Sequence, residues 1–177
     1  MEDGTAKFAI LYFLSSILVL LLAGCAGYHL GPVNPNVRAG EKTIEVVPFN
    51  NQTLQPRLGD AVTQALRERF QTDATYRLAT RNPGDVVVTG VITTYSRKAV
   101  SFLKTDVATA KNYRITVTAH VIARDLETGK ILLEKNVNGY SLTQIGTELA
   151  EEERQSLPLL AEDLARNIVE QITEGSW

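Results

Sequence analysis

The residues able to do chemistry are few in this chain, and they lie far apart in the sequence. Its 177 residues include one cysteine, Cys25, and two histidines, His29 and His120. His29 has no cysteine or acidic neighbour close by, and His120 falls on the polar side of an alternating segment. The sequence contains no metal-spaced cluster, glycine-rich phosphate loop or nucleophile elbow. We therefore expect no enzymatic activity, no metal and no cofactor. A hydrolytic enzyme stays a remote alternative, because catalytic groups converge in space and not in sequence.

Cys25 directly follows an apolar segment, as the cysteine of a lipoprotein signal does. Residues 8–23 are apolar apart from two serines, and small residues stand just before the cysteine in Leu-Ala-Gly-Cys. A secretory apolar region has about 7–15 residues, whereas a membrane-spanning helix needs about 20. This length favours a cleaved signal over a retained anchor helix, although residues 1–7 are acidic where a signal is usually positive. We expect residues 1–24 to be the signal peptide and Cys25 to be lipidated.

A lipidated Cys25 would attach the protein to a membrane. Two or more acyl chains anchor stably, since each buried methylene contributes about 0.8 kcal/mol. The residue after the cysteine is Ala26 and not an aspartate. This resembles the default for Gram-negative lipoproteins that are sorted to the outer membrane. We expect residues 25–40, rich in glycine and proline, to form a lipidated tether on the periplasmic side of that membrane.

Residues 41–177 have the length and the patterning of a single domain. A β-branched run predicts a short strand over 43–49, and apolar residues spaced three and four apart predict a helix from Pro56 to about Phe70. A brief extended segment is expected at 76–79. Three long strands are then predicted, over residues 85–103, 108–126 and 130–142, and a helical stripe follows from Thr147.

The central predicted strand shows which face is buried. From Tyr113 to Ala123 apolar residues alternate with polar ones, which is typical of an antiparallel strand with one face in the core. In the last helix, Pro158 either kinks the helix or begins a second one. The order of elements predicts an α+β, two-layer sandwich, with two helices on one face of a mainly antiparallel four-stranded sheet.

The main polar feature is a cluster of cations at and just beyond the end of the strand predicted over residues 85–103. Arg97, Lys98 and Lys104 surround apolar residues, and Lys111 and Arg114 follow. Cations beside apolar side chains can bind an amphipathic anion, with the charges on its phosphates. The alternative is an ordinary hairpin with a solvated, charged tip. The formal net charge of −2 argues against binding to nucleic acid.

Four segments resemble the lipopolysaccharide-assembly lipoprotein family, LptE. They are Gly27–Leu30 after the cysteine, Val47–Thr53, Asp85–Ile92 and Leu160–Ala165. The resemblance implies two helices on a four-stranded sheet. It also implies a non-enzymatic protein that plugs the lumen of the outer-membrane β-barrel LptD, assists assembly of that barrel and binds lipopolysaccharide. It assigns no lipopolysaccharide-contacting residue, so the cationic cluster supplies the only candidates.

A second family of lipoproteins has a similar first strand. Activators of peptidoglycan synthases share the pattern Pro-Phe-x-Asn-x-Thr, which here runs from Pro48 to Thr53. Those activators carry a long disordered linker after the cysteine, whereas here the first predicted strand follows closely after Cys25. The short spacing favours the LptE reading, and activation of a peptidoglycan synthase stays the alternative.

Overall fold

The computed structural model describes residues 41–174, except 80, 82, 103–109 and 145–148. The predicted signal peptide, the predicted tether with Cys25, and Lys104 lie outside the described residues. The described elements are β1 (Thr43–Val46), β2 (Asn50–Asn51), α2 (Leu58–Asp73), β3 (Arg77–Leu78), β4 (Val86–Phe102), β5 (Ala110–Asp125), β6 (Ile131–Gln144) and α3 (Leu149–Thr173). The two predicted helices and the three long strands are confirmed.

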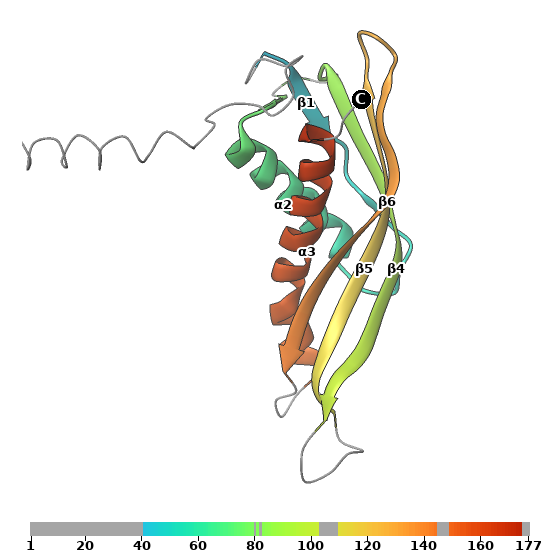
Figure 1. Ribbon diagram of the computed structural model, residues 1–177, viewed down its shortest axis with the longest axis vertical. Coiled ribbons are helices and arrows are strands. Elements are labelled where there is room, and N and C mark those ends of the chain that lie inside the picture. Colours follow the sequence, from blue (N-terminus) through green and yellow to red (C-terminus); the bar gives the residue numbers. More distant parts are fainter. Residues whose placement is uncertain (1–40, 80, 82, 103–109, 145–148, 175–177) are drawn as a thin grey trace, which may run out of the picture. The chain divides into compact units, whose positions relative to one another are not determined.

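The strands form one mixed sheet with two helices on one of its faces (Figure 1). Its order is β3-β1-β4-β5-β6, with β2 beside β4. Neighbours β4, β5 and β6 are antiparallel, but β1 is parallel to both β3 and β4, and β2 is parallel to β4. The expected α+β class is confirmed, but the four-stranded sheet is wrong. The sheet has six strands. The two that the four-stranded expectation does not count, β2 and β3, are each two residues long, and β3 lies within the extended segment expected at 76–79.

The apolar core lies between the sheet and the two helices. In β5, Ile115, Val117, Ala119, Val121 and Ala123 are fully buried, as the alternation predicted. They face α2 and α3, which also pack against each other. The opposite face of the sheet is not covered by a helix among the described elements (Figure 1). We call it the open face.

Helix α3 lies very close to β6 because a glycine stands where they meet. A Cβ added at Gly139 would lie 2.6 Å from the Cβ and 2.7 Å from the backbone of Leu164. The helix continues through Pro158 without a break, so the alternative of two separate helices is wrong. Leu157 and Leu160 on either side of the proline pack on the core, and this packing holds the helix together where the proline removes a backbone hydrogen bond.

A buried carboxylate ties the start of the domain to the β5–β6 hairpin. Lys42 Nζ donates to Asp125 Oδ2 at 2.6 Å, and the Thr128 N–H donates to Asp125 Oδ1 at 2.9 Å. Burial raises the pKa of Asp125, but the bonds from Lys42 and Thr128 outweigh it and hold that pKa below 3.8. The bond to Asp125 raises the pKa of Lys42 above 10.5, despite partial burial.

This pair predicts how stability depends on pH. The lowered pKa of Asp125 stabilises the fold at neutral pH, and the contribution is lost as the pH falls from about 4 through the folded-state pKa. The raised pKa of Lys42 contributes stability that is lost as the pH rises above 10.5. We expect Lys42→Met to lower the free energy of unfolding by about 1–3 kcal/mol at pH 7. Urea unfolding of both proteins checks this; a difference that persisted undiminished at pH 2 would contradict it.

Candidate functional site

The far end of the long strands carries cations without acidic residues. We call residues 94–101 of β4, 112–118 of β5 and 138–143 of β6 the distal meander. These ranges contain Arg97, Lys98 and Arg114 and no aspartate or glutamate. The distal meander lies at the end of the sheet opposite β1 (Figure 1). The charged side chains of these strand segments are therefore all positive, on a chain with a formal net charge of −2.

The adjacent cations of β4 point to opposite faces, as successive residues of a strand do, and a β-bulge decides which face each of them takes. The register between β4 and β5 shifts between Ile92 and Thr94. Beyond the shift, Arg97 pairs with Ile115, which is buried on the helix side. Lys98 pairs with Arg114 and so points to the open face. The cluster predicted from sequence is therefore divided between two faces, and its third member, Lys104, lies outside the described residues.

Each face combines a guanidinium with an aromatic ring. On the helix side, the Arg97 guanidinium lies 6.0 Å from the ring centre of Tyr113. On the open face, the Arg114 guanidinium lies 5.4 Å from the ring centre of Tyr140. A guanidinium at this distance from the face of an aromatic ring is attracted to it by a cation–π interaction, which holds the cation in place. Both faces thus present an oriented positive charge.

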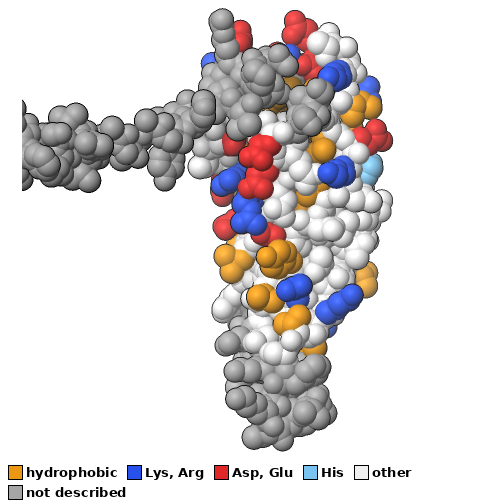
Figure 2. Space-filling model, in the orientation of Figure 1, with side chains coloured by type: hydrophobic (Ala, Val, Ile, Leu, Met, Phe, Trp, Pro, Cys, Tyr) orange, Lys and Arg blue, Asp and Glu red, His pale blue; other side chains and the backbone are white. Residues whose placement is uncertain are grey.

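On the open face two cations are direct cross-strand neighbours. Lys98 stands opposite Arg114, and Leu142 stands on the other side of Arg114. Like charges at such positions repel each other, and an anion between them would relieve the repulsion. Leu142 is 59% exposed, Tyr140 52% and Val100 45%. Figure 2 shows hydrophobic side chains next to those of Lys and Arg on the lower half of the described surface. Cations and exposed apolar groups therefore meet at one place.

Sequence reasoning missed Tyr140 and Leu142 as parts of this surface. They lie on β6, and only the strand register brings them beside Arg114. Their signal in the sequence is alternation: both are large and apolar at positions that alternate with the buried Ser141 and Gly139. The predicted neighbour Lys111 lies in β5, but its side chain lies outside what the structure describes.

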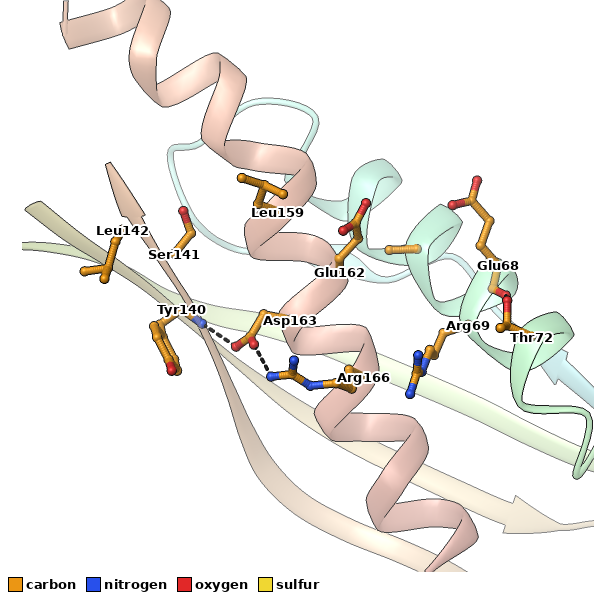
Figure 3. Close-up of a pocket in the computed structure, with 11 residues that line it drawn as sticks. Glu68, Arg69, Thr72, Tyr140, Ser141, Leu142, Leu159, Glu162, Asp163 and Arg166 are labelled. Carbon is orange, nitrogen blue, oxygen red and sulfur yellow. Dashed lines mark hydrogen bonds and ion pairs between the residues drawn. The ribbon is translucent and has the colours of Figure 1, made fainter. Parts of the chain in front are cut away.

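A shallow groove runs across α3 between α2 and β6 (Figure 3). Its volume is about 440 Å³, and both acidic and basic side chains line it. Asp163 lies near its middle, where it accepts the Tyr140 N–H at 2.9 Å and pairs with Arg166. Within the described ranges, no three histidine, cysteine or acidic side chains gather so as to hold a metal. Nor is any described helix both long and apolar enough to cross a membrane.

The LptE family model, described as lipopolysaccharide-assembly, matches residues 41–172. The chain belongs to this family. The resemblance stated from the sequence is thereby confirmed, and the match spans all the described elements from β1 into α3. LptE-family proteins are non-enzymatic lipoproteins of lipopolysaccharide assembly. The comparison with curated proteins gives no match.

Solved structures share the fold of this LptE-family chain at low sequence identity. The hypothetical protein CT253 from Chlamydia trachomatis is 12% identical, with a TM-score of 0.55 over 76% of this chain and 97% of its own. The uncharacterized lipoprotein B from Nitrosomonas europaea is 6% identical, with a TM-score of 0.51 over 82% and 88%. Protein XCC0632 from Xanthomonas campestris is 10% identical, with a TM-score of 0.51 over 81% and 94%. These similarities establish the fold alone.

Proposed function

We propose that this LptE-family chain is an outer-membrane lipoprotein that binds lipopolysaccharide and plugs an LptD-type β-barrel, whose assembly it assists. The observation that carries the proposal is the surface of the distal meander, where neighbouring cations adjoin exposed apolar side chains. Lipopolysaccharide presents phosphates next to acyl chains, so both halves of this surface have a counterpart in the ligand. Family membership supports the same assignment. We propose no catalytic role.

The open face offers the better-defined phosphate site. A phosphate placed between Lys98 and Arg114 accepts charge-assisted hydrogen bonds from both and removes their mutual repulsion. Tyr140 and Leu142 lie beside it and supply apolar contact for an acyl chain. Arg97 with Tyr113 forms a separate cationic position on the other face. The sheet thus separates the two guanidiniums, and the proposed phosphate site lies on the open face alone.

The rest of the open face suits a hydrated barrel lumen. In its middle, between the cationic end and the Ile122–Glu134 pair, the open face carries mostly uncharged hydrogen-bonding side chains, namely Thr94, Ser96, Thr116, Thr118, His120, Asn136 and Asn138. The interior of a transmembrane barrel is polar. Hydroxyl and amide groups can bond such a wall directly or through water without burying a charge. We propose that this band faces the barrel.

The proposed anchor is Cys25, with its signal removed and the mature protein held on the periplasmic side of the outer membrane. The proposal rests on Leu22-Ala23-Gly24-Cys25 behind an apolar segment. We expect the intact mass of the protein purified from membranes to match a chain whose first residue is an acylated Cys25. A mass that retains Gly24 would contradict this.

Binding of purified lipopolysaccharide to the full chain tests the ligand. We expect Lys98→Gln with Arg114→Gln to weaken binding by at least about 100-fold, since hydrogen bonds to charged groups contribute about 1.5–3 kcal/mol each. Arg124→Gln is the control, and each single variant is compared with it, because it removes one positive charge from the open face at the opposite end of β5. Fluorescence titration at two salt concentrations measures the affinities. Equal affinities of the double variant and the control would show that the distal cations are only a solvated strand end.

A further inference from the structure

Strand β6 has one edge that no described strand pairs with. It pairs with β5 along its length and ends the sheet on that side. In an antiparallel pair, alternate residues direct both N–H and C=O away from the partner. On β6 these outward residues include Asn138 and Tyr140, whose backbone groups turn toward α3. Such an edge can take up a further strand unless something covers it.

Two side chains of α3 occupy the outward backbone groups. Asp163 Oδ2 accepts the Tyr140 N–H at 2.9 Å, and Asn167 Nδ2 donates to the Asn138 C=O at 2.8 Å. The carboxylate thus stands where the C=O of a next strand would stand, and the amide where its N–H would. Residues four apart on a helix share a face, so both reach the same edge. Figure 3 shows Asp163 directed toward Tyr140 and bonded to Arg166.

The short side chains reach the edge only because the helix is so close. Asp and Asn extend little beyond their Cβ, and Gly139 lets the Leu164 backbone approach β6 directly. Arg166 pairs with Asp163 and orients its carboxylate. The arrangement therefore depends on Gly139 in the strand and on Asp163 and Asn167 in the helix, which flank the Gly139–Leu164 contact.

We infer that Asp163 and Asn167 are an edge cap that prevents a second copy of this chain from pairing with β6. The second copy is the partner that fits, because the outward pattern is self-complementary. Two β6 strands meeting antiparallel about Tyr140 place Asn138 of each opposite Leu142 of the other, which closes a two-fold dimer. The exposed Tyr140 and Leu142 side chains would then contact each other across the pair. The cap keeps the distal meander free for its ligand, and in this respect it rests on the proposed function.

The oligomeric mass of the full chain in non-ionic detergent tests the cap. Asn167→Asp replaces the donor by an acceptor facing the Asn138 carbonyl, and Asp163→Ala removes the acceptor. We expect the wild type to have the protein mass of one chain by light scattering, and the combined variant to have twice that mass at tens of micromolar. Asp163→Asn keeps an acceptor oxygen and is expected to remain monomeric. Glu162→Ala removes an exposed acid from the same turn and is also expected to remain monomeric.

Each other result overturns the cap. A combined variant that stays monomeric would show that the edge is closed by something else, and dimers of Glu162→Ala would show an effect of charge alone. Loss of the cooperative unfolding transition in both Asp163→Ala and Asn167→Asp would show that these contacts serve to hold α3. The mass is measured without lipopolysaccharide, so failure of ligand binding leaves this test unaffected.

Discussion

Gly139→Ala is expected to lower the free energy of unfolding by about 3 kcal/mol, at the upper end of the usual effect of overpacking. The new Cβ would lie 2.6–2.7 Å from the Cβ, Cα and N atoms of Leu164. Two of these atoms are backbone, so no side-chain rotation relieves the contact and α3 must move away from β6. That movement would also lengthen the Asp163 and Asn167 contacts to the strand edge.

Urea unfolding monitored by circular dichroism measures the loss. Asn138→Ala is the matched control, because Asn138 is the preceding residue, is exposed and bonds Asn167 only through its backbone carbonyl. Its effect is expected to stay within about 0.5 kcal/mol. If Gly139→Ala changed stability no more than this control, the close approach of α3 to β6 would be wrong.

Phe49→Ala is expected to lower the free energy of unfolding by about 3–5 kcal/mol, the usual range for a buried phenylalanine. The Phe49 side chain is 5% exposed, and its ring lies directly on Gly90 of β4, where an added Cβ would be 2.1 Å from Cε1. Removing the ring leaves a cavity under α2 that the glycine cannot fill. The Phe49 N–H would keep its bond to Thr63 Oγ1, so the loss isolates the ring.

Asn50→Ala provides the comparison for Phe49→Ala. Asn50 is adjacent, exposed, and contributes to β2 through its backbone. We expect its effect to be small in the same urea titration. If both variants lowered the free energy of unfolding by a similar amount, the Phe49 ring would contribute no more to stability than the exposed side chain next to it.

The phenylalanine also explains part of the family resemblance. Val47–Thr53, which resembles the first strand and turn of LptE proteins, sets Phe49 on Gly90 and bonds β2 to β4. Its role in this chain is structural. The two ends of the sheet differ in the same way: core packing stabilises the end near β1, whereas the distal end exposes charged side chains.

The long elements could be predicted because their patterns are long. Alternation over β5 identified the buried face correctly from Ile115 to Ala123, and helical spacing identified α2 and α3. Two-residue strands such as β2 and β3 are too short to show any period, so the extended segment expected at 76–79 was not counted as a strand and the parallel pairing was not predicted. Neither was the bulge after Ile92, because its sequence is an ordinary strand sequence.

The same bulge limited the prediction of the candidate site. Arg97 and Lys98 were identified as neighbours in sequence, but a one-residue shift decides which of them faces Arg114. Tyr140 enters the site only through pairing of β5 with β6, which a single sequence does not specify. The sequence therefore shows where the cations lie along the chain, whereas the strand register determines which of them lie side by side.

In-cell photo-crosslinking from the open face tests the proposed role most directly. A photoreactive residue in place of Thr118, in the uncharged band of the full-length chain, is expected to capture an LptD-type outer-membrane β-barrel. The same residue in place of Val117, which is buried against the helices, is expected to capture nothing. Mass spectrometry identifies the captured protein. Recovery of a peptidoglycan synthase from the Thr118 position, without the barrel, would contradict the account.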